Sequence, residues 1–179
     1  MTELPPLTLV LGGAASGKSA FAEALMLSSA RPLVYIATAQ AYDDEMTGKI
    51  AIHQARRGAD WQTLEEPLTL APLLAARTPD QAVLLDCATL WLTNHMMAEH
   101  DIAAETTALL QALSACPAPV IVVSNEVGTG GVPENALARR FQSAQGKLNQ
   151  ALAAQSDLVV QVIAGLPMVL KGTLPEMQS

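Results

Sequence analysis

Residues 12–19 have the types and spacing of a phosphate-binding loop. They fit the pattern of a glycine, four residues and then Gly-Lys-Ser, in the order Gly12, Gly13, Ala14, Ala15, Ser16, Gly17, Lys18 and Ser19. In such a loop the amides converge on phosphate oxygens, the lysine reaches the β- and γ-phosphates, and the final hydroxyl holds Mg²⁺. An apolar run at 7–11 precedes the loop and a helical pattern at 20–27 follows it. Because strand, loop and helix come in order, we predict a bound nucleoside triphosphate rather than a glycine-rich turn without a ligand.

Two acids follow apolar runs later in the chain. Asp86 closes the run 82–85, the setting of an acid that partners a phosphate loop and holds Mg²⁺ directly or through water. The alternative is a helix cap, since Asp is common where a strand leads into a helix. We favour the metal role, because both motifs would lie at the same edge of the sheet. Glu126 follows the run 120–125 at that edge, and functional and structural roles are equally open for it.

The segment 43–57 places a histidine among cations. Its spacing predicts a helix on which Met46, Ile50 and His53 share a face directed at the core. Three basic residues lie three or four positions from the imidazole: Lys49, Arg56 and Arg57. Such cations favour the neutral, nucleophilic ring and could hold phosphates beside it. The pattern alone favours the simpler alternative, a half-buried histidine beside a solvated basic face.

The remaining histidines and the two cysteines have no comparable setting. His95 falls in a predicted helix, and His100 falls in an expected turn after it. We expect neither to bind a metal, because no partner ligand stands at a suitable spacing. Cys87 and Cys116 are too few and too far apart for a zinc cluster, so we expect reduced, buried thiols.

Strand and helix patterns alternate along the chain. The expected strands are 7–11, 33–37, 61–65, 82–86, 120–125, 158–163 and 168–170, and the expected helices are 20–27, 45–57, 68–76, 89–97, 103–115 and 133–154, the last with Pro133 in its first turn. This alternation is typical of an α/β fold, which we expect to be a P-loop NTPase of the RecA-like type with helices flanking a mostly parallel central sheet. Thr38, Ala39 and Gln40 would then lie at the carboxyl edge, where such sheets bind ligands.

Length and composition fit one domain, residues 1–179, with a substantial core. Half of the residues are apolar and 3% are aromatic, which suits helices packed on a buried sheet. The net charge of −7 argues against non-specific binding to nucleic acid, so an anion site must be local. A basic leader is lacking, and no apolar run approaches the roughly 18 residues of a membrane span. We therefore expect a soluble, cytoplasmic protein.

Taken together, these residues resemble the bifunctional adenosylcobinamide kinase / adenosylcobinamide-phosphate guanylyltransferase family of cobalamin synthesis. Many unrelated proteins share the phosphate loop, but the Asn-Glu-Val-Gly loop and the histidine segment are much more specific to this family. The matching stretches run in order over nearly the whole chain: 12–19, 35–40, 43–46, 50–53 with Arg56 and Arg57, 61–65, 84–87, 89–94, 124–128, 132–133, 139–141, 146–150 and 165–167.

The resemblance implies two reactions, with Mg²⁺ accompanying the nucleotide. In the first, ATP or GTP phosphorylates the terminal hydroxyl of the aminopropanol arm of adenosylcobinamide. In the second, GTP loses pyrophosphate to form a covalent GMP-histidine, and the GMP passes to adenosylcobinamide phosphate to give adenosylcobinamide-GDP. The resemblance also implies a homo-oligomer, specifically a trimer.

The resemblance further assigns roles to residues. It implies that His53 is the guanylylated histidine, which reverses the interpretation from the pattern alone, and that Lys18 takes part in catalysis. Ser19 and Asp86 would hold Mg²⁺, as their motifs indicate. The implied nucleotide contacts are Gly12, Gly13, Ala14, Ala15, Ser16, Gly17, Lys18, Ser19, Thr38, Ala39, Gln40, Gln54, Arg56, Arg57, Glu65 and Asp86.

Three positions depart from the family pattern. Ala15 and Gln54 stand where arginine is common, and Gln142-Ser143 replaces a usual Arg-Asp pair. The nucleophile, the loop lysine and the acidic partner are all kept, so we expect the activity to be kept. The alternatives are a small-molecule kinase in which His53 is structural, and a nucleotide-binding regulator without chemistry of its own.

Overall fold

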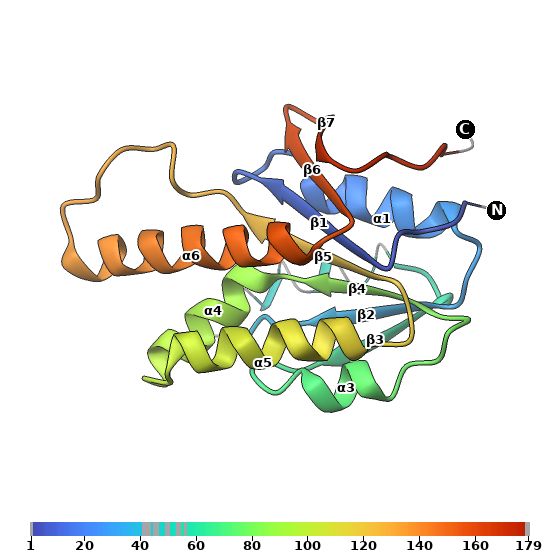
Figure 1. The fold of residues 1–179 in the computed structure, drawn as a ribbon, viewed down its shortest axis with the longest axis horizontal. Helices are drawn as coiled ribbons and strands as arrows, with labels where there is room; N and C mark the ends of the chain where they lie inside the picture. The colour runs from blue at the N-terminus through green and yellow to red at the C-terminus, as the bar shows by residue number, and fades with distance from the viewer. Residues whose placement is uncertain are drawn as a thin grey trace.

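A seven-stranded sheet forms the centre of the molecule, and helices lie against both of its faces (Figure 1). The computed structural model describes residues 2–40, 44, 47–48, 51–52, 55 and 57–177. The strands are β1 Leu7–Gly12, β2 Leu33–Ala37, β3 Trp61–Glu65, β4 Ala82–Asp86, β5 Val120–Asn125, β6 Leu158–Ile163 and β7 Leu166–Lys171. The helices are α1 Lys18–Ser28, α3 Ala71–Ala75, α4 Ala88–Met97, α5 Ile102–Ala115 and α6 Ala136–Gln155.

The strand order is β3-β2-β4-β5-β1-β6-β7, and all neighbours are parallel except β6 and β7. The predicted α/β fold with a mostly parallel sheet is therefore confirmed. The strand β5 lies between β1, which leads into the phosphate loop, and β4, which ends at Asp86. From β1 the chain passes to β2 on one side, whereas β6 lies on the other side. The carboxyl end of β1 is thus a point where the order reverses, the usual ligand site of open α/β sheets.

Two hydrophobic clusters cover the two faces of the sheet. Leu7 and Leu9 of β1 belong to the cluster under α3, α4, α5 and α6, whereas Val10 belongs to the cluster under α1. Successive residues of a strand point to opposite faces, so a strand covered on both faces needs apolar residues at nearly every position. This is why plain apolar runs in the sequence predicted these strands correctly.

Two helices begin later than their patterns predicted. The helix α6 begins at Ala136 rather than at Pro133, because Asn135 caps it. The Asn135 side chain accepts hydrogen bonds from the amides of Leu137 and Ala138 at 2.7 and 3.2 Å. The helix α3 begins at Ala71 rather than at Leu68, because the Glu66 side chain accepts from the amides at 68 and 69 and forms a turn there.

The expected helix at 45–57 falls largely outside the described residues. Those described at 44, 47–48, 51–52 and 55 are helical, and Arg57 lies in a bend. The final expected strand is present as β7, and it runs antiparallel to β6. Among the residues that the structure describes, each helix is too short or too polar to traverse a bilayer.

Candidate active site

The phosphate loop is packed so closely that two of its positions admit only glycine. A Cβ at Gly12 would overlap the Ser16 hydroxyl and lie 2.9 Å from the carbonyl oxygen of Val162. Gly17 has a φ of 92°, and a Cβ there would lie 3.1 Å from the Cα of Gly165. Gly165 also donates its amide to the Ser16 carbonyl at 2.8 Å. The turn between β6 and β7 therefore packs against the phosphate loop. The spacing of residues within the loop did not predict this contact.

The lysine and the hydroxyls of the loop lie at the start of α1. Lys18 is the first residue of this helix, and its Nζ donates to the Gly13 carbonyl at 3.1 Å. No side chain of the described residues caps α1, so its first amides keep the free N–H groups that bind anions. The Ser16 Oγ is buried without a hydrogen-bond partner among the described residues. A buried hydroxyl of this kind normally has a partner, and a phosphate oxygen would supply one.

Asp86 ends β4 and is bonded to a tyrosine of the neighbouring strand. The Tyr35 hydroxyl donates to Asp86 Oδ2 at 2.7 Å, and no described residue donates to the other carboxylate oxygen. The cap of α4 is Cys87, whose Sγ accepts from the Leu90 amide at 3.4 Å. The helix-cap alternative for Asp86 is therefore wrong. Burial, and then the Asp86 charge, raise the pKa of Tyr35 above its ordinary value, so the phenol stays protonated and remains a donor.

Arg57 stacks on the same tyrosine. Its guanidinium carbon lies 3.1 Å from the centroid of the Tyr35 ring, and its side chain is buried. The Trp61 ring meets Tyr35 edge-on, with the centroids 6.2 Å apart. Tyr35 thus joins the end of the segment 43–57 to Asp86, a role that the sequence did not predict. An aromatic residue in an aliphatic strand, two positions before the carboxyl edge, was the available signal.

Thr38 holds the Asp86–Cys87 junction in place. Its hydroxyl donates to the Cys87 carbonyl at 2.7 Å and accepts from the Cys87 amide at 2.9 Å. Its own carbonyl accepts from the Asn94 side chain at 2.8 Å. The Thr38 side chain is fully buried, so its hydroxyl positions the backbone next to Asp86 instead of facing a ligand. Ala39 and Gln40, which follow directly, are half-buried.

The Cys87 thiol is inert in this setting. Burial, together with the Asp86 charge, raises its pKa to about 12, and the Lys18 charge acts in the opposite direction. A protonated, buried thiol is not a nucleophile. Because β1, β5 and β4 are parallel neighbours, the loop that follows β1 and Asp86 at the end of β4 lie at the same edge of the sheet.

Glu126, the second acid of this edge, bonds to its own loop. Its carboxylate accepts from the Gly128 amide at 2.6 Å and from the Thr129 hydroxyl at 2.9 Å. Its backbone amide donates to the Gly12 carbonyl at 3.0 Å, so the loop after β5 braces the start of the phosphate loop. Of the functional and structural roles left open for Glu126, these contacts favour the structural role.

The other predicted site residues are less closely grouped. Glu65 ends β3 in register with Ala37 of β2, which is in turn in register with Asp86 of β4, and it is exposed. Ala14 and Ala15 are exposed at the tip of the phosphate loop. The predicted nucleophile and two neighbouring contacts lie outside the described residues: His53, Gln54 and Arg56.

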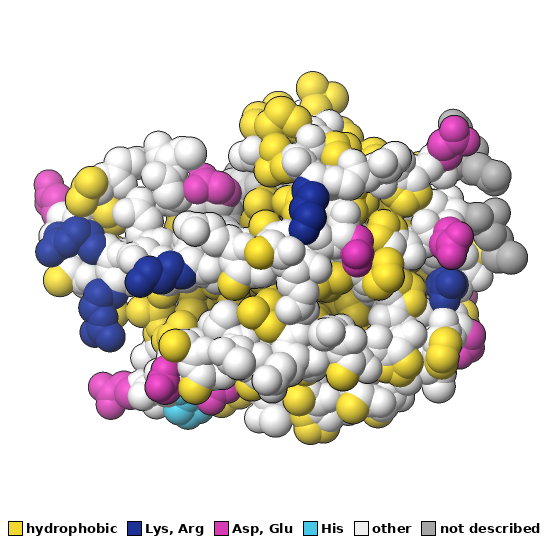
Figure 2. Space-filling view, in the orientation of Figure 1, with side chains coloured by type: hydrophobic (Ala, Val, Ile, Leu, Met, Phe, Trp, Pro, Cys, Tyr) yellow, Lys and Arg dark blue, Asp and Glu magenta, His cyan; other side chains and the backbone are white. Residues whose placement is uncertain are grey.

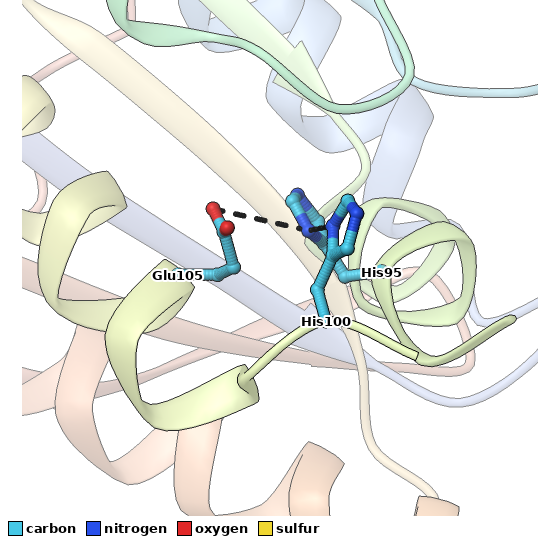
Figure 3. Close-up of side chains that lie close together, drawn as sticks. All are labelled: His95, His100 and Glu105. Carbon is cyan, nitrogen blue, oxygen red and sulfur yellow. Dashed lines mark hydrogen bonds and ion pairs between the residues drawn. The ribbon is translucent and has the colours of Figure 1, made fainter. Parts of the chain in front are cut away.

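The premise that the remaining histidines lack a partner ligand is wrong. His95 and His100 do have partners: their ring nitrogens and a carboxylate oxygen of Glu105 all lie within 4.8 Å of one another (Figure 3). The turn between α4 and α5 brings these three residues together, which linear spacing in the sequence did not indicate.

Comparison with known proteins identifies relatives over most of the chain. A family described as cobinamide kinase / cobinamide phosphate guanyltransferase matches residues 8–170. The bifunctional adenosylcobalamin biosynthesis protein CobP of Pseudomonas aeruginosa is 48% identical over 92% of this chain and 96% of its own length. The protein CobU of Salmonella typhimurium, which carries the same bifunctional description, is 42% identical over 92% of this chain and 99% of its own length.

Solved structures agree on the fold. The RadB recombinase matches 88% of this chain and 74% of its own with a TM-score of 0.52 at 19% identity. A type III secretion ATPase matches 91% of this chain and 56% of its own with a TM-score of 0.50 at 8% identity. At these identities the likeness concerns the architecture alone, and it is that of RecA-like P-loop ATPases.

Proposed function

The chain belongs to the cobinamide kinase / cobinamide phosphate guanyltransferase family and is a bifunctional enzyme of adenosylcobalamin biosynthesis, and we propose how its site serves both reactions. One triphosphate cradle, residues 12–19, presents two phosphorus atoms to two nucleophiles. A hydroxyl of adenosylcobinamide attacks the γ-phosphorus, and His53 attacks the α-phosphorus of GTP. All described strands join one sheet, which supports our proposal that residues 1–179 form a single domain for both reactions.

The contact chain from Arg57 through Tyr35 to Asp86 carries this proposal. It ties the end of the segment that contains His53 to the acid beside the phosphate loop, with 3.1 Å from the guanidinium to the ring and 2.7 Å from the hydroxyl to the carboxylate. Arg57 follows the proposed nucleophile by four positions in the sequence, so the contact chain begins close to it along the chain. A simple kinase would not need a histidine there.

In the kinase step, the loop residues hold the β- and γ-phosphates. Lys18 is placed at the start of α1 to neutralise charge that develops on them, and the amides of α1 add partial positive charge. The corrinoid hydroxyl oxygen bonds to the γ-phosphorus as the bond to the bridging oxygen breaks. The nucleoside diphosphate leaves, and the hydroxyl proton is released.

In the guanylyl step, a neutral His53 nitrogen bonds to the α-phosphorus of GTP as pyrophosphate leaves. A phosphate oxygen of adenosylcobinamide phosphate then attacks the same phosphorus, and the phosphorus–nitrogen bond breaks. This restores the histidine and yields adenosylcobinamide-GDP. Residues of the segment 54–57 and Glu65 are proposed nucleotide contacts, with Arg57 acting from its position on Tyr35.

The donor set at the edge fits Mg²⁺ bound with the nucleotide. Oxygen ligands suit this ion, and Asp86 keeps one carboxylate oxygen without a described donor while Ser19 follows the loop lysine in α1. Ser19 and Asp86 would hold Mg²⁺, which when bound would offset charge on the transferring phosphates.

We also propose a homo-oligomer, a trimer by the family resemblance. All six residues of the edge strand β7 are exposed, including Leu166, Met168 and Leu170 at 71%, 48% and 53%. Figure 2 shows this apolar patch at the top of the view, over the β6–β7 hairpin of Figure 1. Light scattering should give a multiple of the chain mass, and a monomer mass at micromolar concentration would overturn this part of the proposal.

Labelling with GTP tests the central proposal. Incubation with α-labelled GTP, followed by denaturation, should leave acid-labile label on the protein, while γ-labelled GTP should leave none. His53→Ala should lose the label and keep kinase activity, which shows that the variant is folded. Adding adenosylcobinamide phosphate to the labelled wild type should release the label into product.

Each alternative gives a different pattern. A kinase in which His53 is structural would transfer the γ-phosphate and show no covalent label. A non-catalytic regulator would bind the triphosphate and turn over no cobinamide. Label that persists in His53→Ala would refute the nucleophile assignment alone.

A further inference from the structure

Two histidines and a glutamate converge where α4 ends and α5 begins (Figure 3). His95 lies in the last turn of α4, His100 lies in the connection, and Glu105 lies in the first turn of α5. The three side chains point toward one another, and the possible ligand atoms all lie within 4.8 Å of each other. The activity described above uses none of them.

His95 is held in one orientation and one tautomer. Its side chain is almost fully buried, and its ring lies 4.5 Å from the Trp91 ring between centroids. Its Nε2 lies 3.2 Å from the Leu68 carbonyl oxygen, which can only accept, so Nε2 carries the hydrogen. The ring is buried, and burial disfavours a charged imidazole, so a neutral ring with its hydrogen on Nε2 carries a lone pair on Nδ1. The Nδ1 lone pair therefore faces the other two residues.

This orientation matches that of a metal-binding histidine. Such a residue usually donates its second N–H to a carbonyl or carboxylate, which fixes the ring and makes the ligating nitrogen more basic. Here the Leu68 carbonyl accepts the hydrogen bond from the second nitrogen of His95, and it also accepts from the Trp91 indole at 3.0 Å. Two side chains of α4 thus hold one carbonyl in place behind the cluster.

The spacing of the donor atoms is close to that of a tetrahedral site. Two ligand atoms about 2.1 Å from a tetrahedral zinc ion lie roughly 3.4 Å apart. The Nδ1 atoms of His95 and His100 are 2.9 Å apart, and His95 Nδ1 lies 3.8 Å from Glu105 Oε2. The three residues line a cavity of about 190 Å³. All three donor atoms lie within 4.8 Å of one another, and because His100 is exposed and Glu105 is 37% exposed, both side chains are free to shift toward the spacing of a metal site.

We propose that His95, His100 and Glu105 form a binding site for a divalent late first-row transition metal ion, with zinc as the probe. Two imidazole nitrogens, one carboxylate and an open fourth position are a ligand set that zinc adopts. In the metal-free protein, His100 Nδ1–H donates to His95 Nδ1. On binding, His100 would carry its hydrogen on Nε2 instead, so that both Nδ1 lone pairs face the ion.

The bound ion would join three parts of the chain. It would link α4 to α5, and through His95 it would hold the segment after β3 that carries Leu68. An ion that binds the folded chain and not the unfolded one raises the melting temperature. The proposal is independent of the kinase and guanylyl reactions.

A zinc titration of the full chain tests the site. The protein is freed of metal with a chelator, and zinc is added against a chromophoric competitor, with millimolar Mg²⁺ present. We expect one zinc per chain. His100→Ala and Glu105→Gln, which alter exposed or partly exposed side chains, should each weaken binding by about tenfold or more. Glu99→Gln removes a neighbouring exposed carboxylate outside the cluster and should bind as the wild type does.

Cobalt(II) provides a second measurement of the same site. Its visible absorption should be that of a four-coordinate nitrogen and oxygen site, without a thiolate charge-transfer band, and it should disappear in His100→Ala. Zinc should raise the melting temperature of the wild type and of Glu99→Gln, and should raise that of Glu105→Gln less at the same zinc concentration.

Three outcomes would overturn the proposal. In the first, the protein fails to take zinc from a chelator of micromolar affinity, and the cluster is a hydrogen-bonded histidine pair only. In the second, zinc binds with equal affinity to the wild type and both cluster variants. In the third, a thiolate band appears, which places the metal at Cys87 or Cys116.

Discussion

The carboxyl ends of the neighbouring strands β4 and β5 share a sequence pattern, but their acids make different hydrogen bonds. Each strand is a buried apolar run, and each leads into an acid at the carboxyl edge. Asp86 receives the Tyr35 hydroxyl from the next strand, and Tyr35 carries Arg57 on its ring. Glu126 bonds to the amide and hydroxyl of its own loop, at Gly128 and Thr129.

The difference lies in how far the partners are in the chain. The partner of Asp86 is 51 residues away and reaches it through the parallel pairing of β2 with β4. The partners of Glu126 are two and three residues away. An acid bonded across strands has a fixed carboxylate that can serve a ligand, whereas an acid bonded within its loop stabilises that loop. Removing the charge from each acid by the same Glu/Asp-to-amide change tests this distinction.

The largest effect is expected for Asp86→Asn. The change keeps the shape and an oxygen for Tyr35 but removes the charge proposed to hold Mg²⁺, so both activities should fall by about 100-fold or more. Steady-state assays of cobinamide phosphorylation and GMP transfer measure this, with circular dichroism as the control for folding. A loss confined to one reaction would show that the two reactions do not share this acid.

A smaller effect is expected for Tyr35→Phe. The ring under Arg57 remains, but the donor to Asp86 is lost, and outer partners of ligands commonly contribute about tenfold in activity. Both activities should fall together, and the Mg²⁺ concentration for half-maximal rate should rise. Unchanged Mg²⁺ dependence would separate Tyr35 from the metal site.

The same variant changes how stability depends on pH. The pKa of Tyr35 is raised in the folded state, so above about pH 10 the unfolded chain loses this proton while the folded chain keeps it. The stability of the wild type should therefore fall as the pH rises above 10, and Tyr35→Phe should fall less steeply. The raised pKa of Cys87 is common to both proteins and cancels in the comparison of melting temperatures.

A selective effect is expected for Arg57→Gln. The cation over the Tyr35 ring is lost, which should lower the unfolding free energy by about 0.5 to 2 kcal/mol. Because Arg57 closes the segment that contains His53, GMP transfer should fall by a few-fold more than cobinamide phosphorylation. Equal losses in the two rates would argue that Arg57 acts only through Asp86.

The smallest effect is expected for Glu126→Gln, the counterpart of Asp86→Asn. The amide keeps an acceptor for Gly128, so the unfolding free energy should fall by about 1 kcal/mol at most, and both rates should stay within about threefold. Denaturant unfolding and the same two assays measure this. A loss as large as that of Asp86→Asn would mean that the two acids have equivalent roles.

Parts of the site that depend on local chain geometry could be predicted from the sequence. The phosphate loop works through glycines, a lysine and a helix start within eight residues, so its chemistry is visible in the spacing. The predicted start of α6 at Pro133 was wrong for a similarly local reason. Asn135 caps the helix directly, so the helix begins after it. The support of the loop by Gly165 could not be predicted, because that residue lies about 150 positions away and reaches the loop only in the folded sheet.

The sequence by itself determined the fold class, the phosphate loop and the family, because apolar runs, glycine spacing and ordered motifs are properties of neighbouring residues. Only the tertiary structure decided which acid is bonded across strands, because that depended on Tyr35 of β2 reaching Asp86 of the paired strand β4. It also decided that His95 and His100 share a cluster with Glu105, since a turn between two helices, and no regular spacing, sets those distances.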